Sequence, residues 1–185
     1  MQRREDILDA AFEVFSRLGY LNASATEVAR RAGFTLPGLS HHFPTKAALF
    51  EAVVSRRDMD AQEHLVDRRG LDFLRGLVEV ARRDETDRRA TRLFSIISAE
   101  ATDPEHPMHD YMQARYDLIL TSVTEAMRAI RADGGLRDGL DPAEAAKRYV
   151  ALADGLQVQS LYNEQRTTQT FTLRAALQEM LTIPL

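Results

Sequence analysis

The chain has 185 residues, 44% of them hydrophobic, a net charge of −4 and no cysteine. The lack of cysteine excludes disulfides, thiolate metal sites and cysteine nucleophiles, and apolar runs of only a few residues exclude a membrane span. The first residues carry charges within an amphipathic pattern and lack the apolar run of a signal peptide. We therefore expect a cytoplasmic protein without membrane contact.

The charge is not spread evenly along the chain. Residues 1–50 contain six Lys and Arg and five Asp and Glu, a net charge of +1. The acidic balance of the whole chain argues against a basic protein that coats nucleic acid. The N-terminal part alone permits DNA binding without requiring it.

The first predicted helix covers residues 7–18, where apolar residues recur every three or four positions. Gly19 follows as a C-terminal cap. Ser24 and Glu27 have the S-x-x-E spacing of a capping box, which predicts a short helix from there to Arg31, closed by Gly33.

A third short helix is predicted to follow at once. Thr35 is its N-cap candidate, and Pro37 lies in the first turn, where a missing amide proton is tolerated. The helix must end near His42, before Pro44, and Thr45 then caps a longer helix. Two short helices joined by the turn "AGFT", behind a longer helix, indicate a helix-turn-helix unit.

The rest of the chain also has helical periodicity and no strand-like alternation. Loops are expected at "TDPEHP" and "DGGLRDGLDP". The predicted fold class is all-α, with about nine helices. The remaining helices are expected at residues 71–83, 88–102, 108–132, 142–165 and 170–183.

The third helix carries the residue types that DNA reading needs at its N-terminal end. Leu36 and Pro37 suit contacts with thymine methyls, and Gly38 lets the backbone approach the DNA. The side chains that suit hydrogen bonds or charge contacts with bases and phosphates are Ser40, His41, His42 and Lys46. The alternative is a capped connector whose Leu39 and Phe43 face a small core, and spacing alone does not separate the two.

Metal and enzyme sites find little support. Adjacent helical residues point about 100° apart, so His41 and His42 do not chelate one ion. His106 and His109 have better spacing, with acidic residues nearby, but a solvated loop is the simpler interpretation. Phosphate-binding, hydrolase and zinc-protease motifs are absent. We expect no metal, no cofactor and no enzymatic activity.

The stretch "ILDAAFEVFSRLGYLNASATEVARRAGFTLPGLSHHFPTKAALFEAVV" resembles the N-terminal domain of the TetR-type (tetracycline-repressor-like) transcriptional repressors. The matching elements are I-L-x-A-A-x-x-x-F, the following G-Y, S/T-x-x-x-V-A-x-x-A-G and L-x-H-H-F-P-x-K-x-x-L, over roughly residues 4–54. Further on, "GLDPAEAAKRYVALADGLQVQSLYN" looks like the penultimate, dimerising helix of such proteins.

The resemblance implies a DNA-binding domain in residues 1–46 and a ligand-binding and dimerisation domain in residues 47–185. It implies a homodimer that binds a palindromic operator and, as a rule, represses transcription until a small-molecule effector binds. The implied DNA contacts are Thr26, Thr35, Leu36, Pro37, Gly38, Ser40, His41, His42 and Lys46. Many relatives have Tyr where Ser40 stands, which leaves the operator sequence open. A binding or interaction protein with weak or lost DNA binding is the alternative function.

The resemblance also directs attention to two further residue sets. Residues on the helices that enclose the effector cavity are Phe94, Ile97, Glu100, Tyr111, Tyr116 and Met127. Glu100 would need a ligand amine or hydroxyl if buried, but we favour a solvated carboxylate at a helix end. The expected dimer interface consists of Tyr149, Ala153, Leu156, Ser160, Leu173, Leu177 and Met180. The alternative is that these residues pack within one subunit.

Overall fold

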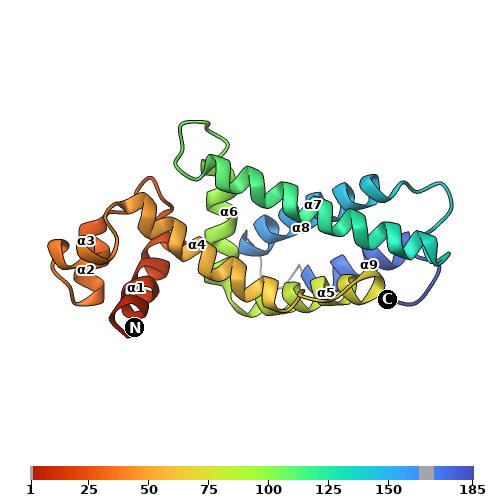
Figure 1. Cartoon of the computed structure of the whole chain (residues 1–185), viewed down its shortest axis with the longest axis horizontal. Coiled ribbons are helices and arrows are strands. Elements are labelled where there is room, and N and C mark those ends of the chain that lie inside the picture. Colours follow the sequence, from red (N-terminus) through yellow and green to blue (C-terminus); the bar gives the residue numbers. More distant parts are fainter. Residues whose placement is uncertain (1, 163–168) are drawn as a thin grey trace. The chain divides into compact units, whose positions relative to one another are not determined.

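The computed structural model describes residues 2–162 and 169–185, which form nine α-helices and thus confirm the all-α prediction (Figure 1). Their order is α1 Gln2–Leu18, α2 Ala25–Ala32, α3 Leu36–His42, α4 Lys46–Glu63, α5 Gly70–Thr86, α6 Arg88–Glu100, α7 His109–Ala132, α8 Pro142–Tyr162 and α9 Gln169–Met180. None of these helices is long and apolar enough to cross a membrane, as far as the described residues go.

The chain divides into two compact units. Unit 1 comprises Met1–Asp60 and Arg92–Met112, and unit 2 comprises Ala61–Thr91 and Gln113–Leu185. Helices α4, α6 and α7 therefore contribute residues to both units. The predicted functional boundary after residue 46 does not coincide with the division into packed units, and it stays a prediction.

Unit 1 contains the three N-terminal helices, and local capping explains where they begin. The hydroxyl groups of Ser24, Thr35 and Thr45 each accept a hydrogen bond from the amide three residues later, at 3.1, 3.2 and 3.0 Å. These bonds satisfy amides that have no partner inside the helix. Aromatic packing holds α1 to α4, since the rings of Phe15 and Phe50 lie 4.5 Å apart and both are fully buried.

Unit 2 is built around one apolar cluster from α5, α7, α8 and α9. Helix α9 packs against both α5 and α8. The cluster includes Leu74, Val123, Met127, Ala146 and Leu177, each with no exposed surface. Burial of such side chains supplies the main driving force for folding this unit.

The predicted start of the first helix and the predicted end of the last helix need correction. Helix α1 begins at Gln2, five residues before the predicted start. Helix α9 ends at Met180, whereas residues 181–183 were expected to be helical. Leu181 instead forms an antiparallel bridge with Leu136, and Thr182 N donates to Gly135 O at 2.9 Å. The predicted residues 163–165 of the eighth helix lie outside the described part of the chain.

Candidate nucleic-acid interface

The turn between α2 and α3 has the geometry expected of a helix-turn-helix unit. Gly33 ends α2 in the left-handed conformation, with φ 74°, and its amide donates to the carbonyls of Ala29 and Arg30. The predicted capping box forms only in part. Ser24 accepts from the amide of Glu27, but the carboxylate of Glu27 bonds Arg30, at 2.8 and 3.0 Å.

Helix α3 presents two distinct faces. Leu39 and Phe43 are buried, with 1% and 4% of their surface exposed, and hold α3 to the core of unit 1. Leu36, Pro37 and Ser40 are exposed, as a base-reading surface requires. Helix α3, which follows α2 in the N-terminal part of the chain (Figure 1), is therefore anchored by its buried side chains and exposes the side chains of its first turn.

The two adjacent histidines differ in their surroundings. His41 is exposed, whereas His42 is half-buried and meets the ring of Phe34 edge-on at 6.0 Å. The His41 and His42 ring centroids lie 5.7 Å apart at 74°. The contact with Phe34 fixes the ring of His42, so His41 is the freer of the two for a base contact.

Lys46 has a structural role that the sequence did not reveal. Its Nζ donates to the carbonyls of Tyr20 at 2.9 Å and Ala23 at 3.1 Å, and it lies 4.2 Å from the centroid of the Tyr20 ring. The ammonium group thus holds the turn between α1 and α2. Its contact with a DNA phosphate stays a prediction.

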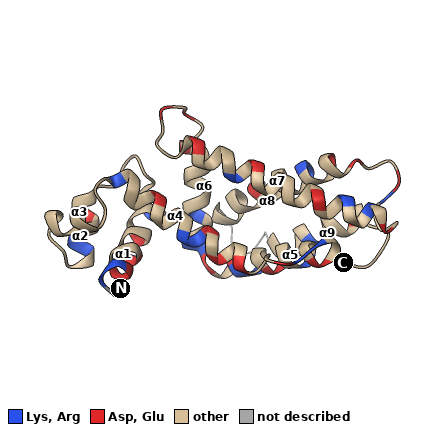
Figure 2. Ribbon diagram, viewed as in Figure 1, with Lys and Arg blue, Asp and Glu red and all other residues tan. Residues whose placement is uncertain are grey.

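The basic side chains nearest to α3 in the sequence belong to the last turn of α2, because α3 itself contains neither Lys nor Arg (Figure 2). Arg30 pairs with Glu27 at 2.8 Å, and Arg31 lies 3.8 Å from Glu13. Both pairs are solvent-exposed, and exposed ion pairs contribute little, so a phosphate can compete for either guanidinium. The sequence interpretation did not consider these two residues, although they are adjacent in the last turn of α2, directly before α3.

The predicted effector-pocket residues fall into different units. Phe94, Ile97, Glu100 and Tyr111 belong to unit 1, whereas Tyr116 and Met127 belong to unit 2. Ile97 and Met127 are fully buried core residues. Their role in effector binding stays a prediction.

Glu100 is largely buried, which corrects the favoured interpretation of a solvated carboxylate; its place in an effector pocket stays a prediction. Its side chain is 14% exposed, and its Oε2 accepts a hydrogen bond from the amide of Tyr20 at 2.8 Å. Gly19 makes this approach possible, since a Cβ at that position would collide with Glu100 Oε1 and with Ile96. The expected partner of the buried carboxylate is therefore a backbone amide in the turn after α1.

The two tyrosines each donate to a carboxylate within their own unit. Tyr111 bonds Asp58 at 2.8 Å in unit 1, and Tyr116 bonds Asp154 at 2.9 Å in unit 2. Burial raises the pKa of Asp154, partly offset by the hydrogen bond from Tyr116 and the charge of Arg115. Asp154 is thus a carboxylate with reduced access to water, a feature that the sequence interpretation missed.

The second histidine pair is held by main-chain groups. His109 Nδ1 lies 2.8 Å from Ala101 O, and the buried His106 accepts at Nδ1 from the amide of Met108 at 3.2 Å. Within residues 2–162 and 169–185, no group of three His, Asp or Glu side chains is placed to hold a metal ion.

The predicted dimer residues are largely used inside one chain. Tyr149, Leu156, Leu173 and Leu177 are between 0% and 6% exposed and belong to the core of unit 2, which corrects the expectation for these four. Ala153, Ser160 and Met180 are half-buried. The large apolar side chains that α8 and α9 leave exposed are Val158 at 44%, Tyr162 at 88% and Phe171 at 72%.

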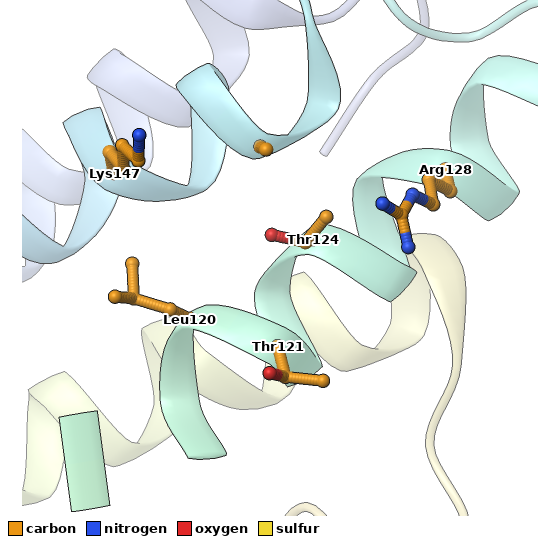
Figure 3. Close-up of a pocket in the computed structure, with 6 residues that line it drawn as sticks. Leu120, Thr121, Thr124, Arg128 and Lys147 are labelled. Carbon is orange, nitrogen blue, oxygen red and sulfur yellow. The ribbon is translucent and has the colours of Figure 1, made fainter. Parts of the chain in front are cut away.

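Unit 2 also has a hollow of about 300 Å³ between α7 and α8 (Figure 3). Its lining is Leu120, Thr121, Thr124 and Arg128 from α7 and Ala143 and Lys147 from α8. None of the predicted effector residues lines it. Arg128 and Lys147 are both exposed, so the hollow is a surface feature rather than an enclosed ligand chamber.

Comparison with known proteins agrees with this architecture. The family model described as "Bacterial regulatory proteins, tetR family" matches residues 7–53, and that described as "BetI-type transcriptional repressor, C-terminal" matches residues 72–182. The second match alone covers more than half of the chain.

Individual relatives extend the similarity over most of the chain. The chain is 26% identical to the HTH-type transcriptional regulator SrpR of Pseudomonas putida over 169 residues, 91% of this chain and 79% of that protein. It is 30% identical to the HTH-type transcriptional repressor Rv1474c of Mycobacterium tuberculosis over 156 residues, 83% of this chain and 80% of the relative.

A solved structure matches the whole fold. SmeT, the repressor of the Stenotrophomonas maltophilia multidrug efflux pump SmeDEF, was solved in complex with triclosan and superposes with a TM-score of 0.84 at 23% identity. The match covers 100% of this chain and 96% of SmeT. Together with the capped α2–α3 unit and the family models, these similarities identify the chain as a member of the TetR family of transcriptional regulators.

Proposed function

We propose that this regulator binds a palindromic operator as a homodimer, inserts α3 into the major groove, and releases the DNA when a small-molecule effector binds. The observation that carries the proposal is the first turn of α3, capped by Thr35, anchored by Leu39 and exposed at Leu36, Pro37 and Ser40. Operator binding requires access to DNA, so the proposed location is the cytoplasm.

The proposed contacts divide into base reading and phosphate positioning. Leu36, Pro37 and Gly38 bring apolar surface and backbone to the base edges, while Ser40 and His41 supply hydrogen bonds. The phosphate contacts are assigned to Thr26, His42 and Lys46 as predicted, and to Arg30 and Arg31 as additions from the charge distribution. With Ser40 in place of a larger residue, this position reads DNA over a short reach.

Dimerisation compensates for the shortness of the recognition helix. A helix of seven residues offers few contacts, and two such helices spaced one DNA turn apart, about 34–36 Å, combine their binding energy. We assign the interface to the outer face of α8 and α9, which exposes Val158, Tyr162 and Phe171. Large exposed apolar side chains that recur on neighbouring helices are typical of a surface that a partner covers.

We place the polar contact for the effector in unit 2, at Tyr116 and Asp154. A carboxylate kept partly from water favours a ligand that supplies a hydrogen-bond donor or a positive charge. In one conformer of the dimer, the spacing of the two recognition helices does not match the operator. An effector that binds this conformer more tightly than the DNA-binding conformer lowers operator affinity, and the ratio of its two affinities limits the effect.

The first experiment tests operator binding directly. A duplex enriched by the purified protein from a random-sequence pool is labelled, and its Kd is measured by fluorescence anisotropy. Leu36→Ala should relax sequence preference at one position, and Arg30→Ala should weaken binding to all sequences and reduce the salt slope by about one. Leu21→Ala is the matched control, because Leu21 is equally apolar and more exposed but lies outside the proposed face.

Failure of any duplex to be enriched would reject the operator-binding proposal and favour a helical small-molecule-binding protein without DNA binding.

Sedimentation velocity tests the proposed dimer interface separately. Phe171→Glu should shift the protein towards monomer, whereas Leu118→Glu on α7, which is 54% exposed, should leave the dimer intact. Equal effects of the two substitutions would contradict the assigned interface.

A further inference from the structure

His106 is a buried histidine in the segment between α6 and α7, within unit 1. Only 6% of the residue is exposed. Its Nδ1 accepts the hydrogen bond from Met108 N, so the neutral ring carries its proton on Nε2. That Nε2 is buried without a hydrogen-bond partner among the described residues. A buried polar atom without a partner is uncommon and calls for a functional explanation.

The nearest acidic atom to this nitrogen already has another role. Glu100 Oε2 lies 3.9 Å from His106 Nε2, and the same oxygen accepts from the amide of Tyr20 at 2.8 Å. One carboxylate oxygen therefore lies between the α6–α7 segment and the turn that follows α1. Gly19 leaves the space for this carboxylate, since it has no side chain there.

The turn contacted by Glu100 positions the operator-reading helices. The ring of Tyr20 meets the ring of His106 edge-on at 5.0 Å. From the other side, Lys46 holds the carbonyls of Tyr20 and Ala23, directly before the cap of α2. A shift of Glu100 thus acts on the backbone that leads into α2 and, through the short Gly33 turn, into α3.

The charges around His106 oppose one another. Burial lowers the pKa of His106, and the positive charge of Lys46 in α4 lowers it further. The negative charges of Glu100 in α6 and of Asp103 in the following segment raise the pKa, but by less, so the net shift of the pKa is downward. Because Nε2 already carries the proton of the neutral ring, protonation adds the second proton at Nδ1 and ends the hydrogen bond from Met108 N. The charged ring then attracts Glu100 through its Nε2–H. Closing the 3.9 Å gap to a charge-assisted hydrogen bond requires a movement of about 1 Å. Because the same oxygen holds the Tyr20 amide, that movement strains or breaks the bond to the turn.

We propose that Glu100 and His106 are positioning residues that form a proton-linked joint: with His106 neutral, Glu100 fixes the α1–α2 turn for operator binding, and protonation of His106 draws Glu100 away and lowers operator affinity. The inference rests on the proposed operator binding. It assigns a regulatory input, proton concentration, that acts without an effector in unit 2.

The test is the pH profile of binding to the enriched duplex, from pH 8 to pH 5.5 at fixed ionic strength. On acidification, the increase in Kd of the wild-type protein should exceed the increase in Kd of His106→Gln by a factor of at least about three. One linked proton can change Kd by at most about tenfold per pH unit. Both proteins keep His41 and His42, so titration at the DNA surface cancels in the comparison. His64→Gln, which removes an imidazole elsewhere, should retain the wild-type profile.

A direct measurement covers the case in which His106→Gln fails to fold. The imidazole resonances of the wild-type protein are titrated by NMR with and without the duplex. Linkage requires the DNA-bound state to favour neutral His106, so its midpoint should fall when DNA is present. Parallel pH profiles for wild type and His106→Gln, or a His106 midpoint unmoved by DNA, would overturn the joint. Absence of any bound duplex would instead reject the operator-binding proposal.

Discussion

The two turns that flank α2 look alike in the sequence and differ in their surroundings. Gly19 and Gly33 each follow a helix and adopt nearly the same left-handed conformation, with φ 71° and 74°. A Cβ on Gly19 would collide with Glu100 and Ile96, whereas nothing lies within 4 Å of the corresponding point at Gly33. The same local signal therefore produces one turn that is anchored and one that is open.

The difference is suited to the two tasks of the region. The anchored turn fixes where α2 begins, through Glu100 on one side and Lys46 on the other. The open turn leaves the space in front of α3 free, as insertion into a DNA groove requires. Rigid support behind an exposed reading helix reduces the ordering cost of binding. The following predictions test whether the two turns differ as much in energy as in geometry.

The largest expected effect is that of Gly19→Ala. Its left-handed backbone and the collision with Glu100 act together, so the free energy of unfolding should fall by about 2–4 kcal/mol. Gly33→Ala is the matched control, with backbone strain of about 1 kcal/mol and no collision. Urea denaturation of both variants measures the difference. Equal losses would show that the anchoring of the first turn has no energetic value.

Lys46→Met tests the other side of the anchored turn. It removes two charge-assisted hydrogen bonds to backbone carbonyls while keeping an apolar stem of similar length, and should cost about 1–3 kcal/mol. Arg31→Met, which breaks only an exposed pair, should cost less than about 1 kcal/mol. Thermal unfolding without DNA is the measurement. An unchanged melting temperature for Lys46→Met would return Lys46 to the role of a phosphate contact alone.

Thr35→Ala addresses the open turn, where only local capping holds the start of α3. Loss of the hydroxyl that accepts from Gly38 N should destabilise the protein by about 1 kcal/mol. Thr26→Ala removes a hydroxyl from the exposed start of α2 that is not its cap, and its effect should stay within about 0.5 kcal/mol. Denaturation midpoints distinguish the two. A cost for Thr26→Ala as large as that of Thr35→Ala would contradict the capping explanation.

The smallest expected effect is a pH dependence confined to the anchored turn. The pKa of His106 is lowered in the folded state, so the unfolded chain binds more protons, and stability is lost as pH falls through and below the ordinary histidine range, near 6.5. Hydrogen exchange, corrected for its intrinsic pH dependence, should show Tyr20 losing protection on acidification. Phe34, whose amide donates to Ala29 O at 2.8 Å, should not. Parallel loss at both amides would place the sensitivity elsewhere.

Prediction from sequence succeeded where the interaction spans a few residues. Capping by Ser24, Thr35 and Thr45 involves amides three positions away, and all three hydrogen bonds to the hydroxyl groups form, although the capping box at Ser24 is only half complete. The placement of Leu39 and Phe43 in the core follows from helical spacing in the same way. The family resemblance carried the assignment further, because an ordered set of such local signals over one stretch of chain is specific.

The contacts that the sequence did not reveal depend on partners far along the chain. Lys46 contacts Tyr20 across 26 positions, and Glu100 contacts the same residue across 80. The stripe of Leu173 and Leu177 is apolar whether it faces its own core or a second subunit, so periodicity does not decide between them; their burial does. Phe171, which burial leaves outside, had no distinguishing signal in the sequence.

The sequence by itself determined the helices, their caps and the helix-turn-helix pattern, because these follow from hydrogen bonds and apolar spacing within a few residues. Only the tertiary structure decided which of two similar glycine turns is anchored, which apolar face of α8 and α9 is left exposed, and which carboxylate lies beside His106. The reason is physical: burial and long-range hydrogen bonds depend on which surfaces meet after the chain has folded, and residue spacing does not encode that directly.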